Sequence, residues 1–132
     1  MQSFPIKSIK DLENISSAAK WQYFEKLVAF VFEQNGFETR TGVIIKDGYG
    51  IKRQIDVLAR KYGVIYVVEC KKWKGKQRSL KAAVAKHLER CGLYEHLYGD
   101  CLPVIVTLLD DALEVEGVPI IPIMKLNNFL NE

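Results

Sequence analysis

The sequence predicts an α/β fold, a three-layer α/β/α core around a mixed central sheet, with the element order α-β-β-β-α-β-β-α. Two observations predict this class. Segments with helical periodicity flank three consecutive strand-like segments, and a continuous apolar run, LPVIVTLL (residues 102–109), follows the second helix. Such a run is typical of a strand buried on both faces, and a strand that follows a crossover helix usually joins its sheet in parallel.

The first helix and the three strands after it have clear boundaries. The helix is expected to begin near Ser16 or Ser17, either of which is a good N-cap, and to end at Gly36, which can adopt positive φ. Its apolar residues recur at helical spacing: Trp21, Phe24, Leu27, Val28 and Val31. Strands are expected at about 37–45, 51–59 and 64–71, separated by the turn sequences KDGYG and KYG. Turns this short predict an antiparallel meander.

The second half of the chain is expected to add a basic helix, two strands and a last helix. The basic helix should run from about residue 78 to residue 98, with Lys81, Lys86 and Arg90 away from its apolar face. That face is predicted to hold Leu80, Val84, Leu88, Cys91 and Glu95. After the apolar run, VPIIPIM (118–124) reads as a strand and KLNNFLNE (125–132) as a helix. The acidic segment DDALEVE between them is predicted to be a solvated loop.

The composition is that of one globular domain over residues 1–132, with a core from about residue 16 and an N-terminal extension over 1–15. Of the 132 residues, 48% are hydrophobic and 27% charged, without low-complexity tracts or linkers. The three cysteines have no CxxC spacing, so neither a disulfide framework nor a zinc site is expected. No apolar run is long enough for a membrane span or a leader peptide. We therefore expect a cytoplasmic protein with no membrane partner.

Charge is distributed unevenly along the chain. Residues 46–90 contain thirteen Lys and Arg against four Asp and Glu, whereas residues 91–132 contain one against seven. A basic middle segment predicts a surface that faces a polyanion such as nucleic acid. The alternative is an ordinary solvated charged surface.

Three carboxylates interrupt segments that are otherwise apolar. In the third strand, Glu69 and Lys71 share one face, and the tight turn before that strand folds Asp56 back beside Glu69. Glu25 lies on the buried side of the first helix. Carboxylates from separate elements can hold a hard divalent cation, and Mg²⁺ usually takes one or two of them together with phosphate oxygens of a substrate. The pattern predicts a phosphodiester-cleaving site, and the alternative is a Glu–Lys ion pair of purely structural importance.

These residues carry a resemblance to a known group of enzymes. The segment IDVLARKYGVIYVVECKK, in which Glu69 follows Asp56 by thirteen residues and ECK supplies an E-x-K tripeptide, resembles the PD-(D/E)XK nuclease superfamily with its restriction-endonuclease-like fold. Glu25 and the element order are similar to the Mrr-like type IV restriction endonucleases and to archaeal Holliday junction resolvases. The proline common before the first acid is absent. The loop GVIIKDGYGIKRQ differs from the serine-glycine-rich loop of the resolvases, which favours the first group.

The resemblance implies a role for each residue of the site. Asp56 and Glu69 would bind Mg²⁺, or Mn²⁺ in its place, with the main-chain carbonyl of Cys70. Lys71 would activate the attacking water and stabilise charge on the phosphate, and Glu25 would complete a water-mediated shell or a second metal site. The expected function is a metal-dependent DNA endonuclease, as a homodimer because two strands need two sites. Alternatives are a Holliday junction resolvase, a non-cleaving nucleic-acid-binding module, and the nuclease subunit of a larger defence complex.

Residues around these acids are candidates for contact with nucleic acid. The candidates are Gln54, Arg53, Lys52, Lys72, Trp73, Lys74, Lys76, Arg78 and Lys81. Trp73 is expected either to stack on a base or to pack on the second helix. The tip KDGYG, with Tyr49 at its apex, either enters a groove or is simply exposed. His87 and His96 are expected to pack or to face solvent rather than to act as bases.

Overall fold

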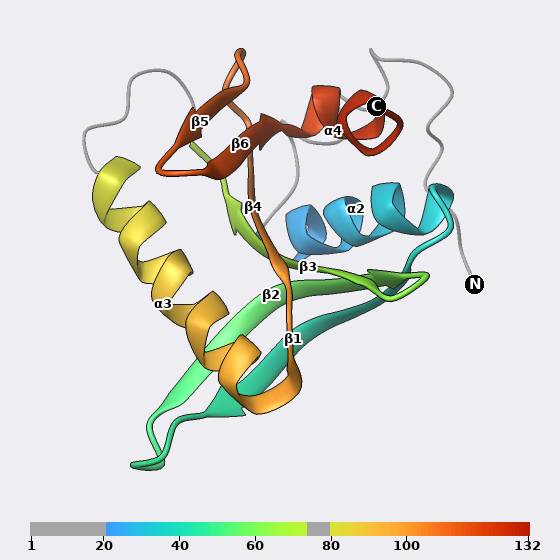
Figure 1. Cartoon of the computed structure of the whole chain (residues 1–132). Coiled ribbons are helices and arrows are strands. Elements are labelled where there is room, and N and C mark those ends of the chain that lie inside the picture. The colour runs from blue at the N-terminus through green and yellow to red at the C-terminus, as the bar shows by residue number, and fades with distance from the viewer. Residues whose placement is uncertain (1–20, 74–79) are drawn as a thin grey trace.

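Six strands form one sheet, and three helices cover its two faces, in the part of the chain that the computed structural model describes, residues 21–73 and 80–132 (Figure 1). The strand order across the sheet is β1-β2-β3-β4-β6-β5. The helices are α2 (Trp21–Gln34), α3 (Leu80–Tyr98) and α4 (Ile123–Leu130). The strands are β1 (Glu38–Lys46), β2 (Lys52–Lys61), β3 (Val64–Lys71), β4 (Leu102–Thr107), β5 (Leu113–Val115) and β6 (Val118–Pro122).

The sheet is mixed, as the sequence predicts. β1, β2 and β3 pair antiparallel as a meander, and α3 then carries the chain across so that β4 joins β3 in parallel. β6 is parallel to β4, and β5 closes the edge antiparallel to β6. The predicted three-layer α/β/α architecture is therefore confirmed.

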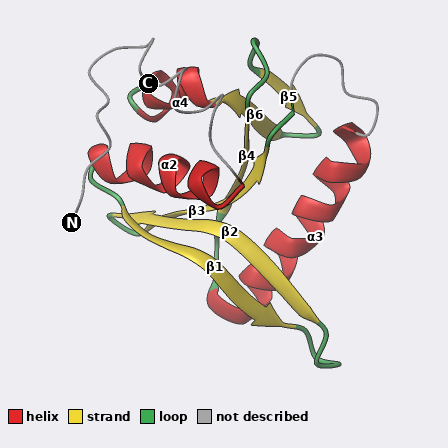
Figure 2. Ribbon diagram, turned by 180° about the vertical axis from the view of Figure 1, so that it is seen from behind, coloured by secondary structure: helices red, strands yellow, loops and turns green. Residues whose placement is uncertain are grey.

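Two hydrophobic layers hold the helices on the sheet. α2 and α4 cover one face, where Phe24, Leu27 and Leu126 are fully buried against strand residues such as Val57 and Val68 (Figure 2). α3 covers the other face, where its residues pack on Val67, Ile105 and other strand side chains. Each central strand is buried on both faces, which explains its continuous apolar sequence. None of the described helices is long and apolar enough to cross a membrane.

Several predicted details are wrong. Residues Leu113–Val115, expected in a solvated loop, form the short edge strand β5, because backbone pairing with β6 needs no buried side chain. The last helix begins at Ile123 instead of residue 125. The buried face of α3 contains Val84, His87, Cys91 and Tyr94, and Glu95 is exposed. The predicted starts of α2 near residue 16 and of α3 near residue 78 lie outside the described residues.

Candidate functional site

The sheet is irregular where β2 carries Asp56. Ile55 packs with α3 residues on one face, whereas Val57 packs with α2 on the other, although residues two apart on a regular strand share a face. Opposite Asp56, Gly42 has φ +60°, in the left-handed region that favours glycine. The pairing of β2 with β3 ends at Val57–Val68, one residue before Asp56. The two strands therefore separate beside this carboxylate.

Asp56 occupies the position where the β2–β3 ladder stops. Its Oδ2 atom accepts a hydrogen bond of 2.9 Å from the backbone N–H of Cys70, and only 7% of the residue is exposed. The N–H and C=O of one strand residue point toward the same neighbouring strand. The Cys70 carbonyl is therefore on the Asp56 side of β3. The Cys70 thiol lies in the core cluster that contains α2 residues.

Glu69 is held by a buried polar chain from α3. The Arg90 guanidinium donates from Nη1 to Glu69 Oε2, and Arg90 Nη1 also lies 3.1 Å from His87 Nδ1. His87 is fully buried, and its Nε2 lies 2.9 Å from the Val67 carbonyl oxygen. Burial lowers the pKa of His87 to about 4. The imidazole is therefore neutral, donates from Nε2, and presents Nδ1 as the acceptor for Arg90.

The three carboxylates influence one another strongly. Burial, followed by hydrogen bonding and repulsion from Asp56, raises the pKa of Glu69 to about 8, although Arg90 and Lys71 oppose this shift. Burial and then the charge of Asp56 raise the pKa of Glu25 to about 7. Burial, with the same three acids, also raises the pKa of the Cys70 thiol well above its usual value. At neutral pH the cluster thus retains protons that a divalent cation would replace.

The donor set suits a cation that keeps most of its own waters. Among residues 21–73 and 80–132, no three His, Cys, Asp or Glu side chains form a group that could hold a metal ion. The predicted roles, with Asp56 and Glu69 as direct ligands and Glu25 in a water-mediated shell or at a second ion, do not require such a preformed group. Mg²⁺ commonly takes only one or two carboxylates and completes its octahedron with water and phosphate oxygens. Asp56 and Glu69, with the Cys70 carbonyl beside them, fit that mode.

The structure places the other candidate residues at varied positions. Lys71 is half-buried and close enough to lower the pKa of Glu69. Gln54 is exposed, and because the strand is irregular at Asp56, the two-residue step between Gln54 and Asp56 does not imply a shared face. Arg53 pairs with Glu89 of α3 at 3.1 Å.

The remaining candidates are divided between surface, core and undescribed residues. Lys52 and Lys81 are exposed, and Lys72 is half-buried. Trp73 packs against the cluster that contains Val84 and Ile105, which agrees with the packing alternative. Lys74, Lys76 and Arg78 lie outside the described residues. A cavity of about 390 Å³, lined in part by Arg40, Leu58 and Tyr94, contains none of the predicted site residues in its wall.

The sequence did not predict the inward position of Arg90 or the role of His87. Arg90 was expected to point away from the core, yet it reaches inward to Glu69. A signal was present in the alternative helical face Val84-His87-Cys91-Tyr94, which has i, i+3 and i+4 spacing. On that face Arg90 is the neighbour of His87 at i+3 and lies beside the sheet.

The comparisons with known proteins identify the family and agree with the fold. A family model described as restriction endonuclease (Mrr_cat) matches residues 16–96. An uncharacterized protein of Archaeoglobus fulgidus is 34% identical over 116 residues, which cover 84% of this chain and 89% of the relative.

Two solved structures share the fold. A crystal structure of a protein of unknown function has a TM-score of 0.59 at 25% identity and covers 76% of this chain, which spans 58% of that protein. The small subunit of the heterodimeric restriction endonuclease R.BspD6I has a TM-score of 0.60 at 14% identity. The matched region covers 92% of this chain and 76% of the subunit. The present chain belongs to the restriction endonuclease family defined by the Mrr_cat domain.

Proposed function

We propose that this protein is a divalent-metal-dependent endonuclease that hydrolyses phosphodiester bonds of DNA. The observation that carries the proposal is the gathering of Asp56, Glu69, Lys71 and Glu25 where β2 and β3 separate. Keeping three acids together costs electrostatic and desolvation energy in the metal-free protein, as the raised pKa values of Glu25 and Glu69 show. Such a cost is typical of a functional site rather than of a structural ion pair.

Each residue of the cluster has a separate role in the proposed reaction. Asp56 and Glu69, with the Cys70 carbonyl, would hold Mg²⁺ or Mn²⁺, and Glu25 would contribute to an outer shell or a second ion. The ion, when bound, supplies Lewis-acid stabilisation of the phosphate and a more acidic water. Lys71, at the end of the same strand, offers an ammonium group to the non-bridging phosphate oxygens and orients the attacking water. Arg90 fixes the Glu69 side chain from behind, so that its rotamer is set before substrate arrives.

The substrate is proposed as DNA because the chain belongs to the restriction endonuclease family and its middle segment is basic. Cleavage of both strands of a duplex requires two sites. We therefore propose a homodimer, with the subunit of a larger assembly as the alternative. Light scattering of the isolated protein distinguishes a dimer from a monomer.

The test is cleavage of end-labelled DNA by the purified chain. Plasmid, linear duplex, four-way junction and RNA duplex are incubated with Mg²⁺, Mn²⁺ or a chelator. We expect metal-dependent cutting of DNA that Glu69→Gln abolishes and that Glu89→Gln, an exposed acid on α3, retains. Symmetric cutting of the junction alone would move the assignment to a resolvase, and metal-independent cutting of any substrate would contradict the proposal.

A further inference from the structure

The hairpin formed by β1 and β2 has an outer face that no described helix covers. Its two strands extend past α3 as a ribbon that ends in the turn of residues 47–51 (Figures 1 and 2). On the inner face, Ile45 is buried and Arg53 pairs with Glu89 of α3. The side chains that alternate with these form the outer face: Ile44, Lys46, Lys52 and Gln54, all of them exposed.

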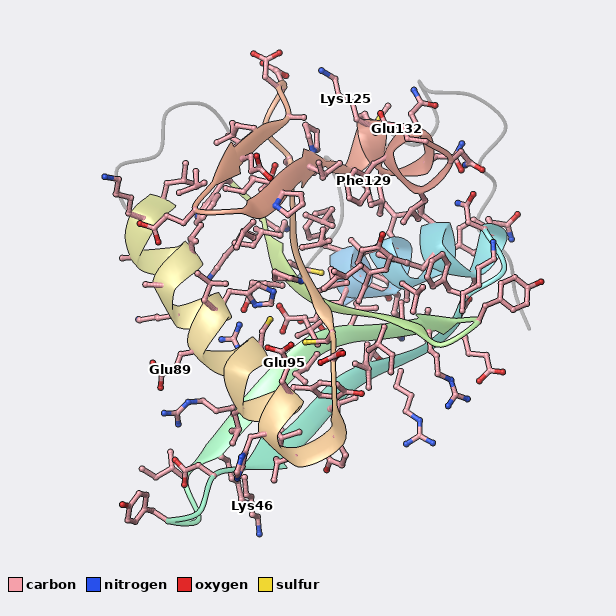
Figure 3. All side chains as sticks on the ribbon, in the orientation of Figure 1. Lys46, Glu89, Glu95, Lys125, Phe129 and Glu132 are labelled. Atoms are coloured by element: carbon pink, nitrogen blue, oxygen red, sulfur yellow. The ribbon has the colours of Figure 1, made fainter. Side chains whose placement is uncertain are left out.

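Two features of this outer face are unfavourable in the isolated protein. Lys46 and Lys52 are directly opposite each other in the β1–β2 register, and like charges in cross-strand pairs repel. Lys46 projects from the end of the ribbon below α3 (Figure 3). Ile44 and, in the adjoining turn, Ile51 each expose 52% of their surface. A polyanion lying on this face would neutralise the lysine pair and cover the two isoleucines.

The turn at the end of the ribbon is held by four internal hydrogen bonds. Asp47 Oδ1 accepts hydrogen bonds of 2.9 Å from the backbone N–H groups of Tyr49 and Ile51. Further bonds join Asp47 N–H to the Ile51 carbonyl and Gly50 N–H to the Asp47 carbonyl, with Gly50 at φ +83°. This framework holds Tyr49 at the apex with 94% of its surface exposed. An exposed aromatic side chain on a preorganised turn binds with little loss of conformational entropy.

We propose that the β1–β2 hairpin enters the major groove of duplex DNA beside the cleavage site. A two-stranded ribbon fits the major groove, which is about 12 Å wide. Lys46 and Lys52 contact phosphates at the groove edge, and Tyr49 contacts base edges at the floor. Lys52 precedes Asp56 by four residues on β2, roughly 13 Å along the strand, which corresponds to about four base pairs of rise. This inference rests on the proposed function, because it names the DNA contact that positions the scissile phosphate.

The test measures duplex binding by the full chain in the presence of a chelator, so that binding is separated from cleavage. We expect Lys46→Gln combined with Lys52→Gln to lower the slope of log affinity against log salt by about 2, since two phosphate contacts are lost. Tyr49→Ala should weaken binding about tenfold. The major-groove ligand methyl green should compete with binding, and the minor-groove ligand netropsin should not.

Matched controls come from the other end of the molecule. Tyr62, in the β2–β3 turn, is 95% exposed, so Tyr62→Ala removes a side chain of the same kind and exposure. Lys125→Gln removes a lysine from α4. Both variants should bind DNA as the wild type does. No variant should have a lower unfolding midpoint than the wild type, because the changed side chains are exposed and the two lysine substitutions remove a repulsion.

The outcomes separate the inference from the proposed function. If the wild type cuts DNA and the three hairpin substitutions leave affinity and salt slope unchanged, the inference is overturned and the nuclease assignment stands. A change of oligomeric state caused by Tyr49→Ala, without a change in DNA affinity, would overturn it in favour of contact with a second copy. If the wild type neither binds nor cuts DNA with any metal, both proposals fail together.

Discussion

At the scale of single residues, the central feature is a carboxylate cluster that is only partly neutralised. Glu69 has Arg90 and Lys71 near it, yet its pKa is about 8 because burial and Asp56 outweigh both cations. Burial and the charge of Asp56 raise the pKa of Glu25 from its ordinary value of 4.5 to about 7. The protein therefore holds protons in this cluster at neutral pH, and the binding of a divalent ion should release them.

The first prediction concerns the pH dependence of stability without metal. The folded-state pKa values of Glu25 and Glu69 exceed their ordinary values, so the folded state binds more protons than the unfolded chain. The free energy of unfolding should therefore fall as pH rises from about 5 to about 8. His87, with its lowered pKa, affects only the region below about pH 6.5.

Urea unfolding in chelator between pH 6.5 and pH 8 tests this directly. The midpoint should decrease over that range, and the double variant Glu25→Gln, Glu69→Gln should show a flatter profile. A wild-type midpoint that increases with pH would show that the cluster is not protonated in the folded protein.

The second prediction concerns Arg90 as a positioning residue. Because Arg90 lowers the pKa of Glu69, Arg90→Gln should move the acidic limb of the cleavage pH profile to higher pH. It should also cost about 1–3 kcal/mol of stability, since Glu69 Oε2 and His87 Nδ1 lose their donor. Arg90→Lys should restore part of both properties.

Arg60→Gln serves as the control, since Arg60 pairs with Glu38 at the exposed edge of the sheet. Exposed pairs of this kind contribute little to stability. Loss of stability in Arg90→Gln with an unshifted pH profile would restrict Arg90 to a structural role.

At the scale of elements, the opening between β2 and β3 depends on the irregular position of Gly42 and Asp56. Gly42 has φ +60°, and a Cβ added there would meet no atom within 4 Å. Gly42→Ala should therefore cost about 1–2 kcal/mol through backbone strain alone. Cleavage should decrease further than the fraction of folded protein explains, because a regular β1–β2 pairing would move Asp56.

Gly92→Ala provides the matched substitution within the same molecule. Gly92 lies inside α3, and an added Cβ there also meets no atom within 4 Å. Alanine should stabilise the helix by about 0.5–1 kcal/mol and leave cleavage unchanged. Thermal unfolding and cleavage assays on both variants give the comparison, and equal stability changes in the two would refute the strained geometry at Gly42.

At the scale of the whole molecule, periodicity and the order of helices and strands along the chain were sufficient to predict the architecture. The antiparallel meander, the crossover α3 and the parallel strand β4 all follow from local patterns that pairing and burial reinforce. The strand β5 was missed because its three residues are mostly exposed, and an alternation of three residues, Leu-Glu-Val, is too short to indicate a strand. An edge strand that is stabilised by backbone pairing leaves almost no signal in the sequence.

The candidate site was only partly predictable for a related reason. Asp56, Glu69 and Lys71 stand out because charged residues interrupt apolar strands. Arg90 does not stand out, because it is one of three Lys and Arg residues in α3 and its pairing with Glu69 of β3 is a tertiary contact. The irregularity at Gly42 likewise depends on tertiary contacts that sequence periodicity does not contain.

The most direct test of the proposed catalytic centre is Mn²⁺ binding followed by electron paramagnetic resonance, with DNA cleavage measured on the same samples. The wild type should bind Mn²⁺ and cut DNA, Asp56→Asn should lose both properties, and Glu114→Gln, an exposed acid on β5, should retain both. If Asp56→Asn binds Mn²⁺ and cuts DNA as the wild type does, then the carboxylate cluster between β2 and β3 is not the catalytic centre.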